Sequence, residues 1–271
     1  MVRLTPHLNA WQFLVFRGAG VACAFALVWR LKNNSSVLVA LARLGRTGFA
    51  VSIVLGVSAI SFIFALKLTT VANALFLSSC SPLLSAILGY FVLGERLSAL
   101  QLASVGLGFV GLAIIVGGGL DLGNMLGNAN ALVSALGFAS GGVLMRRAGQ
   151  RDFVPAIFGY GLVCALTAMI AIVSLGGALM PSFAEAFVGF AAGFVLMGLG
   201  FVCFLRGAVH VPAVGQTVLA QTETAFGPLW VWLFLGERAT LATLVGGAVI
   251  LVAVVAMALS GAPPVAPNAS N

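Results

Sequence analysis

Nine long apolar runs follow one another along the chain, and short segments of turn-forming and charged residues separate them. A helix of about 20 apolar residues crosses a bilayer core about 30 Å thick, so each run is long enough to form one membrane span. The Pro- and Asn-containing tail at 261–271 is predicted to be disordered. The predicted helices lie near 9–29, 47–66, 69–92, 98–117, 128–146, 154–175, 186–205, 211–234 and 239–260.

The composition agrees with a chain that lies mostly in lipid. Hydrophobic residues make up 61% of the sequence and charged residues only 7%, whereas about 25% of residues are charged in soluble proteins. The 13 Lys and Arg residues are scattered between the apolar runs. The net charge of +7 therefore indicates orientation in a membrane and not nucleic-acid binding.

The distribution of cations predicts which side of the membrane each loop occupies. When successive loops are assigned to alternate sides, one side receives nine Lys and Arg residues and the other three. The positive-inside rule places the richer side in the cytoplasm, which predicts a multi-pass protein of the cytoplasmic membrane with its N-terminus outside and its C-terminus inside. The nine are Arg30, Lys32, Arg43, Arg46, Arg96, Arg146, Arg147, Arg151 and Arg206, and the three are Arg3, Lys67 and Arg238.

The second half of the chain repeats the first. The segment that begins at Thr69 aligns with the segment that begins at Val211, at an offset of 142 residues. Both contain the tetrapeptide LGER, at Leu93–Arg96 and at Leu235–Arg238. The charge distribution puts one LGER loop inside and the other outside, so the repeats are inverted, which is typical of secondary transporters.

The repeat unit contains five helices, of which the first half shows four. The helix at 128–146 needs a partner ahead of the first apolar run, and the sequence holds none there. The predicted fold is therefore an all-α polytopic membrane protein with inverted five-helix repeats at 1–120 and 121–260. Nine helices are present in an arrangement of four plus five where ten are expected, so the first half lacks one helix of the repeat, and the sequence leaves open whether its start is misplaced.

Two segments carry a resemblance to a known family. They read SPLLSAILGYFVLGERLSALQLASVGLGFVGL and TETAFGPLWVWLFLGERATLATLVGGAVIL. They resemble the paired fourth-to-fifth and ninth-to-tenth helices of EamA-type transporters in the drug/metabolite transporter superfamily, and TPHLNAWQFLVFRG is similar to that family's second helix. The resemblance implies ten helices and transport of small metabolites or drugs by alternating access, through a central cavity between the inverted repeats.

Glu223 is the most informative single residue. It lies twelve residues after Val211 in the predicted helix 211–234, about 18 Å into a core about 30 Å thick. A carboxylate at that depth is costly unless it faces a polar cavity or an ion partner. We therefore predict that Glu223 binds substrate or a coupling ion. The alternative is a protonated Glu223 whose hydrogen bonds a neighbouring helix satisfies.

Other polar side chains accompany Glu223 on its helix. Helical spacing places Gln216 on the same stripe as Glu223, with Thr217, Gln221 and Thr224 beside it. We predict that Gln216, Thr217 and Gln221 contribute to the same substrate-binding or coupling site.

The inverted counterpart of this helix reads VANALFLSSCSP. Asn73, Ser78 and Ser81 supply polar groups there, and Ser81 aligns with Glu223 at a similar depth counted from the other end. We predict that the three residues share a midplane site with the Glu223 helix, as in other inverted-repeat transporters. The alternative is that they only hydrogen-bond across helices.

Arg17 is the only cation placed within a predicted span. It lies about 12 Å below the outer end of its helix, within reach of the interface if its side chain extends outward. Three interpretations stay open: extension of the side chain to the interface, binding of an anionic substrate group, and pairing with Glu223.

Neither enzyme chemistry nor a cofactor is predicted. His7 and His210 stand near membrane interfaces without Cys or carboxylate neighbours at metal-ligand spacing. No GxSxG or GxxxxGK[ST] sequence occurs. A literal GxGxxG at Gly106–Gly111 lies inside an apolar span, where it indicates close helix packing. The LGER loops are predicted to end helices and form tight turns.

The predicted function is a secondary transporter, with a small-molecule substrate and the lipid bilayer as partners and no nucleic acid. A non-transporting membrane scaffold and a truncated, inactive transporter are the alternatives. A midplane Glu suits proton coupling or a cationic group, whereas Arg17 suits an anion, so the sequence leaves substrate and coupling ion open.

Overall fold

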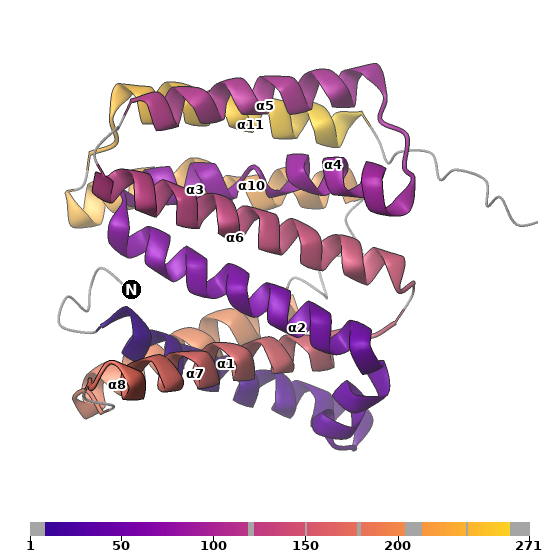
Figure 1. Ribbon diagram of the computed structural model, residues 1–271, viewed down its shortest axis with the longest axis vertical. Coiled ribbons are helices and arrows are strands. Elements are labelled where there is room, and N and C mark those ends of the chain that lie inside the picture. Colours follow the sequence, from indigo (N-terminus) through magenta and orange to yellow (C-terminus); the bar gives the residue numbers. More distant parts are fainter. Residues whose placement is uncertain are drawn as a thin grey trace, which may run out of the picture. The chain divides into compact units, whose positions relative to one another are not determined.

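The computed structural model describes residues 9–118, 122–149, 151–177, 180–203, 213–236 and 238–260. The described residues are helical apart from short connections, and no strand occurs among them. Figure 1 shows the helices in space. They are α1 (Ala10–Asn33), α2 (Val37–Leu68), α3 (Val71–Ser78), α4 (Ser81–Leu93), α5 (Ala99–Gly117), α6 (Leu122–Arg147), α7 (Val154–Ser174), α8 (Phe183–Ala191), the π-helix η1 (Ala192–Leu199), α10 (Ala213–Leu235) and α11 (Leu241–Leu259).

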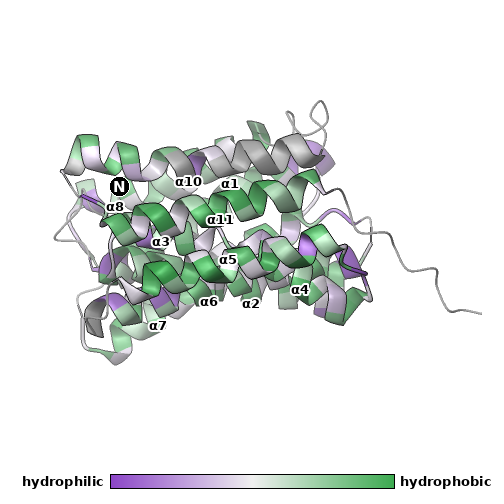
Figure 2. Ribbon diagram, turned by 90° about the horizontal axis from the view of Figure 1, so that it is seen from above, coloured by the Kyte–Doolittle hydropathy of each residue, from purple (hydrophilic) through white to green (hydrophobic). Residues whose placement is uncertain are grey.

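The helices confirm the predicted all-α membrane fold. Eight spans within the described residues are long and apolar enough to cross a membrane. The helix α10 matches the remaining predicted span at 211–234. Hydrophobic residues run along the helices, and hydrophilic residues are found mainly toward their ends (Figure 2). The tail at 261–271, predicted to be disordered, lies outside the described residues.

The helix α2 starts at Val37, well before the predicted start near residue 47. Its backbone is non-helical at Gly45, where φ is 61° and ψ is −147°. Glycine adopts this conformation without the steric cost that a Cβ would bring. The residues before Gly45 therefore form a separate helical segment, which the charges of Arg43 and Arg46 had indicated to be a loop.

The predicted helix at 69–92 is interrupted. The helix α3 ends at Ser78 and α4 begins at Ser81, with Ser79 and Cys80 in a turn between them. Pro82 explains the interruption, because its ring has no N–H to donate to the Ser78 carbonyl and crowds that carbonyl sterically. The hydropathy pattern could not predict this break, since both parts are apolar.

The described helices belong to two structural units, which differ from the two sequence repeats. Unit 1 contains Met1–Lys67 and Leu144–His210, and unit 2 contains Leu68–Val143 and Val211–Asn271. In unit 1, α1 packs mainly on α7, with α8 and η1 as further neighbours. In unit 2, α5 packs mainly on α11, and α10 packs on α3 and α11. Each unit therefore combines helices from both halves of the sequence.

Unit 1 is held together by a close approach of α1 and α7 at two glycines. A Cβ at Gly18 would lie 2.7 Å from the Gly161 carbonyl oxygen and 2.8 Å from the Ala165 nitrogen. A Cβ at Gly161 would lie 2.7 Å from both the Gly18 carbonyl oxygen and the Ala22 nitrogen. The backbones are thus in direct contact, which is how small residues join helices in membranes.

The helices α5 and α11 meet in the same way in unit 2. A Cβ at Gly111 would lie 2.6 Å from the Gly246 carbonyl oxygen, and a Cβ at Gly246 would lie 2.6 Å from that of Gly111. The predicted packing role of the GxGxxG sequence therefore holds for Gly111. Its first glycine, Gly106, has no neighbouring atom within 4 Å of a built Cβ.

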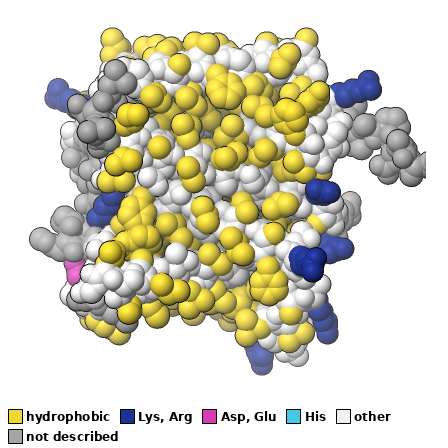
Figure 3. Space-filling model, viewed as in Figure 1, with side chains coloured by type: hydrophobic (Ala, Val, Ile, Leu, Met, Phe, Trp, Pro, Cys, Tyr) yellow, Lys and Arg dark blue, Asp and Glu magenta, His cyan; other side chains and the backbone are white. Residues whose placement is uncertain are grey.

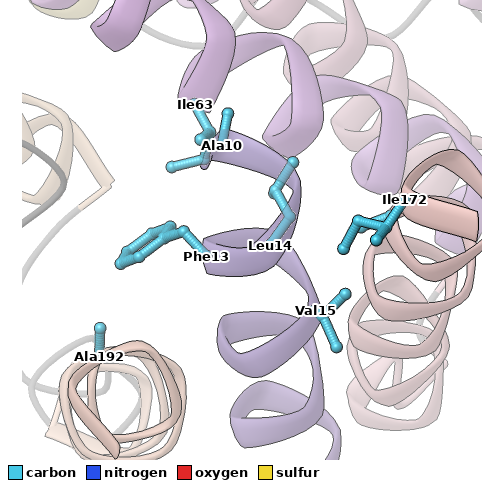
Figure 4. Packing of buried hydrophobic residues seen from close by; sticks show 8 residues of the cluster. Ala10, Phe13, Leu14, Val15, Ile63, Ile172 and Ala192 are labelled. Carbon is cyan, nitrogen blue, oxygen red and sulfur yellow. The ribbon is translucent and has the colours of Figure 1, made fainter. Parts of the chain in front are cut away.

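Apolar side chains fill the space around the α1–α7 contact. Leu14 and Val15 of α1 lie beside Ile172 of α7 (Figure 4). The cluster also draws residues from α2 and η1, so it links the helices of unit 1. Its buried members are Ala10, Phe13, Leu14, Val15, Ile63, Ala168, Ile172 and Ala192.

The outer surfaces of the helices are also apolar. Phe183 is 87% exposed, Leu241 77% and Phe91 76%. Hydrophobic side chains are spread over the face drawn in Figure 3. Such side chains on most of the described helices indicate contact with lipid tails, because soluble proteins rarely expose apolar surface so widely.

Both LGER segments end a helix, as predicted. Gly94 is the C-cap of α4 in the left-handed conformation, with φ at 70°. Gly236 follows α10 with φ at 67°. Ser98 and Thr240 then cap α5 and α11 by accepting hydrogen bonds from backbone N–H groups of the first turn. The repeated sequence therefore encodes a repeated helix end.

The glycine contact predicts opposite effects of one substitution at two sites. Gly18→Ala places a methyl group against the backbone of α7 and should destabilise the protein by about 1–3 kcal/mol. Gly106→Ala meets no neighbour and should stabilise it slightly, by about 0.5–1 kcal/mol, because alanine favours a helix. Thermal unfolding of the purified variants checks both effects. A Gly18→Ala protein as stable as Gly106→Ala would contradict the contact.

Candidate functional site

Glu223 lies near the middle of α10, about 15 Å from the helix start at Ala213. Its side chain is exposed. No hydrogen bond or ion pair joins Glu223 to another described residue. A carboxylate at mid-membrane depth without such a partner is available to a proton, a cation or a substrate.

The other residues of α10 that were predicted to share a site with Glu223 have side chains that the structure does not describe. Gln216, Thr217 and Gln221 belong to α10, but their side chains are outside the described part of the chain. Thr224, the neighbour on the C-terminal side, is buried.

Two of the predicted serines flank the interruption between α3 and α4. Ser78 is the last residue of α3 and Ser81 the first of α4. The Ser78 hydroxyl oxygen is buried and has no hydrogen-bond partner among the described residues. Most buried hydroxyl groups form a hydrogen bond. The Ser78 hydroxyl is an exception, so it is available to bind another molecule. Ser79, between them, donates a hydrogen bond from its hydroxyl to the Phe76 carbonyl oxygen at 2.7 Å.

Asn73 is part of a buried hydrogen-bond network in unit 2. Its Nδ2 donates to Thr69 Oγ1 and to Asn128 Oδ1, each at 3.3 Å. Its Oδ1 accepts a hydrogen bond of 2.6 Å from Thr243 Oγ1. The amide of Asn73 therefore links α3 to α6 and α11. For Asn73, this agrees with the alternative given in the sequence analysis, in which the residue hydrogen-bonds across helices.

The rest of this network lies at the ends of the same helices. Thr69 Oγ1 donates to Asn128 Oδ1 at 3.1 Å, and the hydroxyls of Thr240 and Thr243 lie 2.8 Å apart. Thr69, Asn128 and Thr243 are each less than 5% exposed. The network joins three helix ends that the alternating topology assigns to one side of the membrane.

Arg17 forms a contact within unit 1. Its guanidinium donates a hydrogen bond to the Tyr160 hydroxyl of α7. Both side chains are half-buried. Cys164, one helical turn after Tyr160, is buried near the same guanidinium, and its thiol donates to the Gly56 carbonyl oxygen at 3.6 Å. Arg17 therefore has a hydrogen-bond partner inside the span. Its side chain does not need to extend to the membrane interface, which was one of the three interpretations left open by the sequence.

The backbone around Arg17 is enclosed by neighbouring helices. Gly18 follows it at the contact with α7, and a Cβ at Gly193 of η1 would collide with the Arg17 carbonyl oxygen. The π-helix η1 occupies the middle of the predicted helix at 186–205. Short π-helical segments occur often at functional sites. Arg17 is thus fixed at the point where the helices of unit 1 approach most closely.

Sequence reasoning missed Tyr160, although a signal was present. The dipeptides Arg17–Gly18 and Tyr160–Gly161 occupy corresponding places in α1 and α7, with the two glycines in contact. An alignment that paired these glycines would have paired Arg17 with Tyr160. A tyrosine hydroxyl inside an apolar span needs a hydrogen-bond partner, so the pair could have been predicted.

These groups can bind and move charge. Arg17 is a fixed cation that can hold an anionic group, and Glu223 is a carboxylate that can take up a proton or hold a cation. Among the described residues, no group of three or more His, Cys, Asp or Glu side chains could hold a metal ion.

Comparisons with known proteins agree with the repeat architecture. The model of the EamA-like transporter family matches the chain twice, over residues 3–117 and 125–259. A solved structure described only as "Crystal structure of protein" superposes with a TM-score of 0.64 at 18% sequence identity, and the match covers 94% of this chain and 90% of that chain. At that identity, the likeness shows a shared fold. No curated protein matches the sequence.

The buried network predicts the effect of removing one hydroxyl. Thr243→Val keeps the shape of the side chain and takes the donor away from Asn73 Oδ1, so it should cost about 1 kcal/mol of stability. Thr167→Val is the control, because Thr167 is exposed on α7. Thermal unfolding of the two variants should show a lower midpoint for Thr243→Val alone, and equal midpoints would argue against the network.

Proposed function

Because the chain belongs to the EamA-like transporter family, we propose that it is a secondary transporter, which moves small molecules across the cytoplasmic membrane by alternating access. The family's members are membrane transporters, so a small-molecule substrate and the lipid bilayer are its partners. Proton coupling, the residues involved and the choice of membrane are our proposals.

The observation that carries this proposal is Glu223. It lies in the middle of a helix in a membrane protein, exposed, and joined to no other described residue by a hydrogen bond or ion pair. A carboxylate in that position is costly to keep unless it serves transport. We assign to Glu223 the binding of a coupling proton or of a cationic group on the substrate.

The interrupted α3–α4 helix supports the proposal from the other sequence repeat. Ser81 lies ten residues after the start of α3 at Val71, as Glu223 lies ten residues after the start of α10 at Ala213. Broken helices leave polar groups unpaired at mid-membrane depth in inverted-repeat transporters. The buried, unpaired Ser78 hydroxyl is such a group. We therefore assign Ser78 and Ser81 to substrate binding and Asn73 to the support of their helix.

Arg17 and Tyr160 have a separate role in the proposal. The guanidinium recognises an anionic group of the substrate, and the Tyr160 hydroxyl holds the guanidinium in place. A cation inside a membrane span is retained at a cost, and a single neutral partner leaves its charge free to attract an anion. Tyr160 is thus a positioning residue that acts through Arg17.

Flux into proteoliposomes tests the function. Purified protein should take up members of a panel of radiolabelled amino acids, nucleosides and sugars with saturable kinetics, and a pH gradient should drive accumulation. Glu223→Gln should abolish gradient-driven uptake, because an amide can neither take up nor release the proton, while the protein still assembles. Glu223→Asp, which keeps a carboxylate, should retain part of the uptake.

Two results would count against this assignment. Gradient-driven uptake by Glu223→Gln at the wild-type rate would remove Glu223 from coupling. Uptake that does not saturate for any compound would favour a pore, and no uptake at all would favour a membrane scaffold.

The Arg17–Tyr160 pair predicts non-additive effects on the KM of the substrate found in this assay. Arg17→Gln should raise KM at least about tenfold, because a hydrogen bond to a charged group is worth about 1.5–3 kcal/mol. Tyr160→Phe should raise it less, and the double variant should match Arg17→Gln, since Tyr160 acts through Arg17. Arg17→Lys, which keeps the charge, should lie between wild type and Arg17→Gln. If the KM increase of the double variant equalled the product of the two single increases, the positioning role of Tyr160 would be contradicted.

A further inference from the structure

A second candidate site lies in unit 1, at the end where α1 ends and α2 and α7 begin. A cavity of about 630 Å³ opens there. That volume falls within the range of about 300–1,000 Å³ that is usual for small-molecule sites. Its polar lining comes mainly from Trp29, Ser35, Ser36, Arg43 and Arg151.

The cavity carries an excess of positive charge. Asp152, the one acidic side chain among the described residues that line it, already has partners: its Oδ2 lies 2.7 Å from Lys32 Nζ, and its Oδ1 accepts a hydrogen bond of 3.0 Å from the Val154 backbone N–H. Arg43 and Arg151 form no ion pair with another described residue. Two guanidinium groups from different segments therefore line one cavity with their charges unmatched, which favours an anionic ligand.

Neutral donors around the cavity add to this preference. The Ser35 hydroxyl oxygen accepts a hydrogen bond of 3.2 Å from Trp29 Nε1, so its own O–H can donate to a ligand. The helix α2 begins at Val37, directly after Ser36. Its first backbone N–H groups have no partner within the helix and carry the positive end of the helix dipole. Together with the arginines, these donors suit the oxygens of a phosphate group.

The surroundings of the cavity are apolar and exposed, as at a membrane interface. Leu31 is 78% exposed, Leu38 58% and Val39 50%. Val39 also lines the cavity, and Arg43 follows it one turn later on the segment of α2 before Gly45. A segment with exposed apolar side chains and a basic residue is typical of helices that lie at the headgroup level of a bilayer.

We propose that this cavity binds the headgroup of an anionic phospholipid, whose phosphate contacts Arg43 and Arg151 and whose acyl chains lie along Leu31 and Leu38. The charge distribution of the sequence assigns this end of unit 1 to the cytoplasm, where anionic lipids of the inner leaflet attract basic residues. The bound lipid connects the start of α2 with the segment before α7. It thus joins the two sequence repeats within unit 1, independently of the transported substrate.

The test uses purified full-length protein in neutral detergent micelles, with phosphatidylglycerol, phosphatidylcholine or glycerol phosphate added. Phosphatidylglycerol should bind, as measured by native mass spectrometry, and should raise the midpoint of thermal unfolding. The double variant Arg43→Gln/Arg151→Gln should bind it at least about tenfold more weakly, because charged hydrogen bonds to the phosphate are lost. The control Arg46→Gln/Arg147→Gln, with two neighbouring arginines outside the cavity lining, should bind like wild type.

Three results would overturn the proposal. One is equal affinity for phosphatidylglycerol in the double variant and its control. Another is equal binding of phosphatidylcholine, which would show that charge plays no part. The third is an equal stabilisation by glycerol phosphate at the same concentration, which would identify a site for soluble phosphate compounds. In the wild type, added salt should also reduce the stabilisation by phosphatidylglycerol, because exposed charges are screened.

Discussion

Helices inside a bilayer gain little hydrophobic free energy by packing on one another, because lipid tails are as apolar as the side chains that would leave them. Dispersion contacts between closely approaching backbones must replace that term. Gly18 with Gly161, and Gly111 with Gly246, provide these approaches. The other features of each unit depend on them: the apolar cluster around Leu14 can form only once α1 and α7 touch.

The weak hydrophobic driving force inside the bilayer also affects the role of polar side chains. In unit 2, the Asn73 amide pairs with Asn128 and Thr243 at the ends of three helices, where it fastens the packed arrangement. Glu223, by contrast, is exposed and forms no hydrogen bond or ion pair with another described residue. This contrast separates polar groups that serve structure from polar groups available to a substrate, and a sequence alone shows both as polar positions in apolar helices.

Much of the fold follows from the sequence because bilayer thickness sets helix length. The span predicted at 98–117 is α5, Ala99–Gly117, and the helix ends at Gly94 and Gly236 follow from the repeated LGER. The break before Pro82 and the kink at Gly45 were not predicted, because hydropathy does not register backbone direction. The Tyr160 partner of Arg17 was missed because the offset of 142 residues pairs Arg17 with Gly159, and only the offset of 143 that brings Gly18 onto Gly161 pairs Arg17 with Tyr160.

The division of the chain into units has a consequence for its synthesis. Unit 1 combines Met1–Lys67 with Leu144–His210, so α1 leaves the ribosome more than a hundred residues ahead of α7. Translation adds about 5–20 residues per second, so α1 waits for several seconds without the helix that covers it. During that interval Arg17 lacks Tyr160, and the bilayer must tolerate a cation that costs about 2.5–3.5 kcal/mol at the centre of an inserted helix. The strongly apolar remainder of α1 must compensate for this cost, which limits how polar the rest of that helix can become in related sequences.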